Sequence, residues 1–223
     1  MSDETGKAVT RGMFNGASAG GALRRVLEIA IDGVSKLPSA KATAAKQLER
    51  RGDVDEAVAA LINQHIRLAS AQGFVTNIGG LATTVITIPA NLAGVAIVQV
   101  RMVAAIAHLR GYDIDDPRVR TALMMCMLGS EEVERRVRAQ ELPSVPLAIA
   151  TAPVFDPALD ALVADKVMAN LIAKVGGKRM TLIASKRIPL LGGGVGAVMD
   201  GLTTRMIGHY AREQFAIRRR LTR

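Results

Sequence analysis

Residues 85–108 read VITIPANLAGVAIVQVRMVAAIAH, and this apolar stretch decides how the rest of the chain is read. It overlaps residues 68–100, a run of 33 residues without a charged side chain. That run exceeds the roughly 20 apolar residues that cross a bilayer core. Pro89 interrupts it, and a proline costs a helix interior about 3 kcal/mol. We therefore expect a hairpin of two apolar helices, one ending near Ile86 and one from Pro89 to about Arg110.

Arg101 argues against a fixed membrane span in this hairpin. In a spanning helix its guanidinium would lie at bilayer depth, at a cost of about 2.5–3.5 kcal/mol on insertion scales. No Trp or Tyr marks an interface within the hairpin. We expect the hairpin to form protein core, with shallow insertion at a membrane left open.

The segments on both sides of the hairpin have helical spacing and clear end signals. Asp53 and Asp116 are expected to cap helices, Pro117 to occupy a first helical position, and Gly111 to end a helix. Expected helices also cover residues 22–36, 38–51, a stretch ending at 176–177, a short basic stretch to 187, and 189 to about 219. No segment alternates with period two. The predicted fold class is all-α, a compact bundle of about eight helices around the apolar hairpin and a glycine-rich C-terminal helix.

The domain organisation is simple. Residues 1–20 are rich in turn formers and predict a flexible N-terminal lead, and residues 21–223 predict a single helical domain. The N-terminus shows no signal peptide, which predicts a cytoplasmic chain. Cys126 is the only cysteine, so it cannot form an internal disulfide, and we expect it to be a small buried side chain.

Small residues recur along the last expected helix. Gly192, Gly196 and Asp200 fall four apart, as do Gly193, Ala197 and Gly201. Such ridges let helix backbones approach closely, so we expect this helix to pack against the hairpin.

A charge that leaves water needs a partner, which predicts that Arg101 meets a buried acid such as Asp200 or Asp32. Arg101, His108 and Asp200 form the expected buried polar cluster. A competing reading makes His108 a general base that Asp113 or Asp115 orients. We favour the structural reading and assign no catalytic residue.

All of the excess positive charge lies near the C-terminus. The chain carries a formal charge of +9, and residues 174–223 hold eleven basic and two acidic side chains. Such a field attracts an anionic lipid surface or nucleic acid. The predicted membrane- or anion-binding residues are Lys178, Arg179, Lys186, Arg187, Arg212, Arg218, Arg219, Arg220 and Arg223.

Motifs for catalysis and metal binding are weak or missing. The GASAG segment matches a nucleophile elbow around Ser18, but that motif needs a preceding strand, which the sequence does not predict. The sequence contains no H-E-x-x-H, no C-x-x-C and no P-loop frame. We therefore predict no metal and no cofactor. Nucleic acid is disfavoured as a partner because base stacking needs aromatic side chains, and only Tyr210 and Phe215 follow Phe155.

Two blocks of the sequence resemble the EcsC protein family. One is GGLATTVITIPANLAGVAIVQVRMVAAIAHLRGYDIDDPRVRTALMMCMLG, and the other is KRIPLLGGGVGAVMDGLTTRMIGHYAREQF. The resemblance implies a bacterial protein; one family member is encoded beside an ABC transporter. It transfers no catalytic residue.

The expected function is that of a non-enzymatic, membrane-associated accessory protein, peripheral to the inner face of the cell membrane. The expected partners are an anionic membrane surface and, as a candidate, a transporter. The alternatives are a small-molecule enzyme that uses His108 with Asp113 or Asp115, and a nucleic-acid binder that uses the basic C-terminal end.

Overall fold

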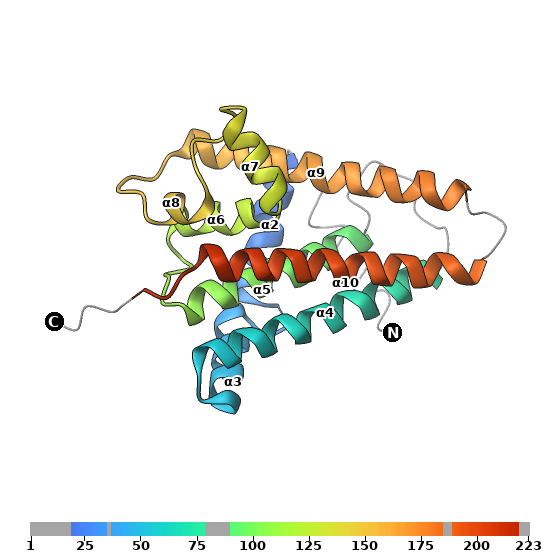
Figure 1. The fold of residues 1–223 in the computed structure, drawn as a ribbon, viewed down its shortest axis with the longest axis horizontal. Helices are drawn as coiled ribbons and strands as arrows, with labels where there is room; N and C mark the ends of the chain where they lie inside the picture. Colours follow the sequence, from blue (N-terminus) through green and yellow to red (C-terminus); the bar gives the residue numbers. More distant parts are fainter. Residues whose placement is uncertain (1–18, 35–36, 79–89, 185–188, 219–223) are drawn as a thin grey trace.

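The computed structural model is built from α-helices (Figure 1). It describes residues 19–34, 37–78, 90–184 and 189–218. These ranges contain nine helices and no β-strand, so the predicted all-α fold is confirmed. The described helices are α2 (Ala19–Asp32), α3 (Ala40–Arg51), α4 (Val54–Ile78), α5 (Ala90–Leu109), α6 (Pro117–Cys126), α7 (Ser130–Arg138), α8 (Pro146–Ala150), α9 (Pro157–Ala184) and α10 (Pro189–Gln214).

Helices α4, α5 and α10 form the long axis of the molecule (Figure 1). Helix α4 packs against α5, and α10 packs along both, which is the packing expected for the hairpin and the last helix. A Cβ added at Gly201 would lie 2.5 Å from the Oγ of Ser70 on α4. A Cβ at Gly208 would lie 3.1 Å from atoms of Ile62 and Met102. The absence of a side chain at these two positions therefore lets α10 approach α4 and α5 closely.

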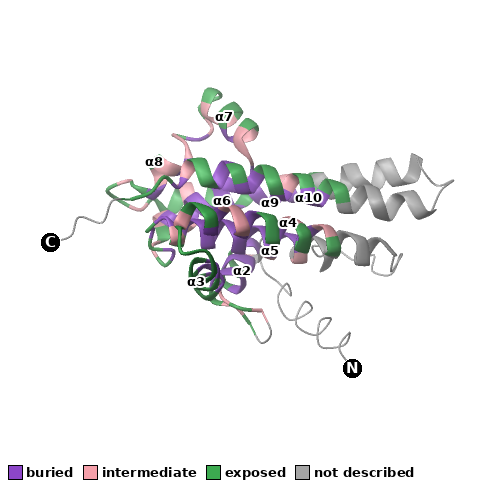
Figure 2. Ribbon diagram, turned by 60° about the horizontal axis from the view of Figure 1, so that its bottom comes forward, coloured by how far each residue is buried: buried purple, intermediate pink, exposed green. Residues whose placement is uncertain are grey.

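The remaining helices cover other sides of this layer. Helices α2 and α3 pack against α5, whereas α9 packs on α2 and α6. Buried residues line the inward faces of the helices, as Figure 2 shows. An ion pair of 2.7 Å between Arg24 and Asp160 joins α2 to α9. Cys126 is fully buried, as expected, and burial raises the pKa of its thiol.

Several end signals predicted from the sequence hold. The Asp116 side chain accepts a hydrogen bond from the backbone of Arg118, with Pro117 at the start of α6. The Asp53 carboxylate accepts one from the backbone of Glu56 at 2.9 Å. Gly111 follows α5 with φ +88°, a left-handed conformation that glycine adopts without strain.

The predicted boundaries of three helices are wrong. Helix α2 begins at Ala19 and ends at Asp32, earlier than the predicted 22–36. Helix α9 continues through Gly176 and Gly177 to Ala184, where we predicted a break and a separate basic helix. A glycine costs a helix interior only about 1 kcal/mol, so the pair does not end the helix.

Helix α10 ends at Gln214 and not near residue 219, because the fully buried Phe215 turns into the core. Beyond it, the backbone N–H of Arg218 donates to the carbonyl of Arg110 at 3.1 Å, which a continued helix would prevent. The tip of the apolar hairpin and most of the N-terminal lead fall on residues 79–89 and 1–18, outside the described residues.

Candidate functional site

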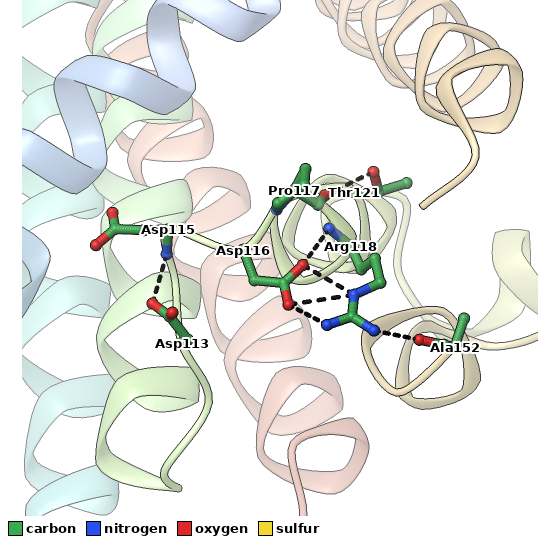
Figure 3. Close-up of polar contacts among 7 residues, drawn as sticks. All are labelled: Asp113, Asp115, Asp116, Pro117, Arg118, Thr121 and Ala152. Atoms are coloured by element: carbon green, nitrogen blue, oxygen red, sulfur yellow. Dashed lines mark hydrogen bonds and ion pairs between the residues drawn. The ribbon is translucent and has the colours of Figure 1, made fainter. Parts of the chain in front are cut away.

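The loop between α5 and α6 holds the aspartates that the sequence offered as catalytic partners (Figure 3). Asp116 forms an ion pair of 2.5 Å with the guanidinium of Arg118. The hydrogen bond from Arg118 lowers the pKa of Asp116. Arg118 also donates to the carbonyl of Ala152 at 2.5 Å, which ties the start of α6 to the chain after α8. The oxygen of Asp113 accepts a hydrogen bond from the backbone of Asp115 at 3.0 Å. These contacts shape and fasten the loop.

Asp115 is already neutralised by two cations. Its carboxylate lies 2.5 Å from the Nζ of Lys41 and 3.3 Å from Arg120. The hydrogen bond from Lys41 is the main reason why the pKa of Asp115 is lowered. Lys41 belongs to α3, so this contact holds the loop against a distant part of the chain. A catalytic pairing of His108 with Asp113 or Asp115 stays a prediction.

The predicted cluster of Arg101, His108 and Asp200 is not buried as a whole. Arg101 and Asp200 are each 5% exposed, as expected. His108, however, is exposed at the end of α5, so its predicted burial is wrong. The reason is that α5 reaches the molecular surface at its last turn, just before Gly111 ends the helix.

The predicted acid partner of Arg101 is also missing among the described residues. The Nε and Nη1 atoms of Arg101 are buried and have no hydrogen-bond partner. No ion pair joins its guanidinium to Asp200, and Asp32 is exposed. Burial lowers the pKa of Arg101. The core of this protein holds a guanidinium that no described carboxylate balances.

His65 on α4 is a buried neighbour that the sequence did not single out for this cluster. Its Nδ1 lies 2.8 Å from the carbonyl of Leu61, which can only accept, so Nδ1 carries the proton of the neutral ring. Its Nε2 is buried without a partner. Burial lowers the pKa of His65 to about 4; the Leu61 bond opposes this, and the charge of Arg101 adds to it. The imidazole is therefore neutral near pH 7.

A second polar contact links α5 to α10. The amide of Gln99 donates to the hydroxyl of Thr204 at 3.0 Å, and Thr204 donates to the backbone carbonyl of Asp200 at 2.7 Å. Gln99, Thr204 and Asp200 are all buried. Because unmade hydrogen bonds are costly in a core, such a contact fixes how α10 sits on α5.

The outer face of α10 is apolar where the structure describes it, and this is the feature that sequence reasoning missed. Val198, Leu202 and Met206 are 59%, 50% and 59% exposed, and Met199 beside them is 48% exposed. A spacing of four places Val198, Leu202 and Met206 on one line along the helix. We call these four residues the α10 stripe. Folded proteins seldom gather large apolar side chains on their surface without a partner.

The outer face changes character along the helix. After Met206 it carries His209, Arg212 and Glu213, and Arg205 lies beside the stripe. All of these polar residues are exposed. The face is therefore apolar towards the N-terminal end of α10 and polar towards its C-terminal end. The signal in the sequence was the i, i+4 spacing of 198, 202 and 206, but spacing alone does not tell which face is covered.

Of the nine basic residues predicted to bind anions, the structure places the side chains of two. Arg212 forms an ion pair of 3.5 Å with Asp55. The guanidinium of Arg218 lies over the ring of Tyr112, 5.4 Å from its centroid. Both are thus engaged with their own protein. The side chains of Lys178 and Arg179, and the residues Lys186, Arg187, Arg219, Arg220 and Arg223, lie outside the described part of the chain.

The described residues contain no candidate metal centre and no candidate membrane span. No group of three or more His, Cys, Asp or Glu side chains in these residues could hold a metal ion. None of the described helices has both the length and the apolar character of a membrane span.

Comparison with known proteins shows the family. Residues 20–219 match the EcsC protein family, and the chain therefore belongs to it. No curated protein and no solved structure matches the chain.

Proposed function

We propose that this member of the EcsC protein family is a peripheral membrane protein that docks the outer face of α10 onto an anionic lipid surface. The observation that carries the proposal is the α10 stripe, in which four large apolar side chains are each about half exposed or more. An apolar surface next to basic residues is typical of helices that lie in the interface of a bilayer.

The stripe supplies the apolar part of the attraction. Complete burial of a Val, Leu or Met side chain is worth roughly 1.5–3 kcal/mol, so partial insertion of four such side chains gives several kcal/mol. Because Val198, Leu202 and Met206 share one line, a helix lying flat on the surface inserts all three together.

The positive charge of the chain supplies the electrostatic part of the attraction. Residues 174–223 carry the whole excess of +9, and Arg205 lies beside the stripe. Each basic residue near an anionic surface contributes about 1 kcal/mol, and salt screens that term. Basic charge near an apolar face favours a membrane over nucleic acid as the partner. An anionic bilayer offers headgroups to the basic residues and an apolar interior to the apolar side chains.

We place the protein at the inner face of the bacterial cell membrane, as an accessory protein without a catalytic site of its own. The leaflet that faces the cytoplasm carries the anionic lipids that such a basic surface meets. A transporter in the same membrane is the candidate protein partner, and this part of the proposal rests on the family alone.

Sedimentation with vesicles tests the proposal. The chain should sediment with vesicles of phosphatidylcholine mixed with phosphatidylglycerol. It should sediment much less with vesicles of pure phosphatidylcholine. Replacing Arg219, Arg220 and Arg223 with Gln should weaken binding and its salt dependence, while Arg212 and Arg218 keep their internal contacts.

Two other results would contradict the proposal. Salt-sensitive binding to duplex DNA without binding to anionic vesicles would favour a nucleic-acid partner. Equal sedimentation with neutral and anionic vesicles would remove the role of the basic residues.

A further inference from the structure

An open groove between α3 and α4 gathers three arginines. It has a volume of about 820 Å³, and its lining includes Arg50 and Arg51 of α3 and Arg67 of α4. Asn63, Gln64 and Leu68 of α4 line it too, and no acidic side chain does. We call it the α3–α4 groove. Its size falls in the range of small-molecule sites.

The arginines of the groove differ from most of the other arginines that the structure describes. Carboxylates bind Arg24, Arg25, Arg110, Arg118, Arg120, Arg135, Arg136, Arg138 and Arg212. Arg50, Arg51 and Arg67 make no ion pair or side-chain hydrogen bond with the residues that the structure describes. Arg50 and Arg51 also lie in the last turn of α3, where positive charge suits the helix dipole. That effect does not account for Arg67, which lies in the middle of α4.

The groove also has a fixed amide. The Nε2 of Gln47 donates to the Oε1 of Gln64 at 2.5 Å, and Gln47 is buried. This bond fixes the side-chain amide of Gln64, whose own NH₂ group has no partner among the described residues. The two N–H donors of Gln64 thus belong to the same lining as the three arginines. Leu68 adds an exposed apolar side chain to the same lining.

We propose that the α3–α4 groove binds a phosphate group, held by Arg50, Arg51 and Arg67 and by the amide of Gln64, with an apolar part of the ligand on Leu68. Guanidinium groups bind phosphate oxygens through paired N–H donors, which makes arginine the preferred side chain for this task. A phosphate carries up to two negative charges and accepts several hydrogen bonds, which matches three cations and an amide. Such a group belongs to a soluble phosphoester or to the headgroup of a phospholipid.

The groove is separate from the α10 stripe. The residues of α4 that lie against Gly201 and Gly208 of α10 are Ile62, Ile66 and Ser70. The groove uses Asn63, Gln64 and Arg67, which lie on another face of the same helix. Binding in the groove therefore does not depend on the proposed docking of α10.

Titration calorimetry tests this proposal with two probes, inorganic phosphate and dihexanoyl phosphatidic acid below its micelle concentration, in chloride buffer of constant ionic strength. The key variant is Gln64→Glu. It has nearly the same shape and still accepts the bond from Gln47, but it removes the two donors and adds a negative charge. Arg67→Gln removes one cation at an exposed position.

For the probe that the wild type binds, each variant should have an affinity at least about tenfold lower, because a hydrogen bond to a charged group is lost. Arg138→Gln is the control, since Arg138 is an exposed arginine on α7 that neither lines the groove nor lies beside the α10 stripe, and it should bind as the wild type does. Circular dichroism checks that all variants keep their helices.

The two probes separate the sources of the phosphate. If inorganic phosphate binds as tightly as the lipid, the groove recognises the phosphate group alone. If the lipid binds more tightly and Leu68→Ala removes the difference, the ligand is a phospholipid headgroup. A wild type without saturable binding of either probe would overturn the proposal. So would a Gln64→Glu variant that binds normally, or an equal loss in Arg138→Gln.

Discussion

The ring of Phe215 meets the ring of Tyr112 edge to face, with centroids 5.0 Å apart and planes inclined by 73°. Phe215 is the residue directly after α10, and Tyr112 lies in the loop after α5. Both are buried. This contact fastens the end of α10 to the loop that leads into α6, and it explains why the last helix stops where it does.

Phe215→Ala should therefore destabilise the protein strongly. Removal of a buried phenyl group loses its burial and leaves a cavity, which together cost about 3–5 kcal/mol. Urea denaturation followed by circular dichroism measures the change. Phe215→Leu keeps most of the apolar contact and should lose clearly less, so equal losses in the two variants would contradict the packing role.

Two buried arginines, Arg101 of α5 and Arg110 directly after it, should respond in opposite ways to replacement by methionine. Arg110 donates to Asp55 at 2.6 Å, whereas Arg101 has no carboxylate partner among the described residues. Arg110→Met should lower the free energy of unfolding by about 1.5–3 kcal/mol, because a charged hydrogen bond is lost. Arg101→Met should raise it by about 1–4 kcal/mol, because a buried unbalanced charge becomes apolar.

Urea denaturation of both variants at neutral pH tests this contrast. If Arg101→Met destabilised the protein as much as Arg110→Met, Arg101 would have an acid partner after all. The original expectation from the sequence would then hold.

His65 should make the protein lose stability as the pH falls from about 6.5 towards 4. An ordinary histidine takes up a proton near pH 6.5, while burial holds the pKa of His65 at about 4. In this window the unfolded chain binds more protons than the folded chain, so acid favours unfolding. The difference in pKa corresponds to a loss of up to about 3 kcal/mol.

Urea denaturation at several pH values between 7 and 5 measures this slope. Glu132, whose pKa the hydrogen bond from Arg135 lowers to about 2, stabilises the fold above the ordinary pKa of glutamate, and this contribution falls away only at lower pH. His65→Asn keeps a donor for the Leu61 carbonyl but does not titrate, and it should flatten the slope. An unchanged slope in this variant would assign the effect to another group.

The sequence predicted those parts of the fold that depend on local chemistry. Asp53 and Asp116 cap helices because a carboxylate satisfies free N–H groups wherever it precedes a helix. The ridge that contains Gly201 predicted a close helix approach, since a missing side chain acts in any surroundings. The all-α class followed from the spacing of apolar residues.

Features that depend on three-dimensional packing could not be predicted in the same way. Arg101 was expected to meet an acid, but which side chains surround it depends on how α4, α5 and α10 pack. The end of α10 depends on where Phe215 finds a core to enter. The α10 stripe has the spacing of a buried face, and only the structure shows that α4 and α5 pack on the other side of the helix.

A fluorophore on the α10 stripe tests most directly whether this face contacts a membrane. Leu202→Cys can be labelled selectively with an environment-sensitive dye, because Cys126 is fully buried and burial raises the pKa of its thiol. The matched control is Val154→Cys, another exposed apolar position, between α8 and α9. With vesicles that contain phosphatidylglycerol, the account predicts a blue-shifted emission and quenching by spin-labelled lipid at position 202, and no change at 154. Bound protein whose label at 202 stays in water would contradict it.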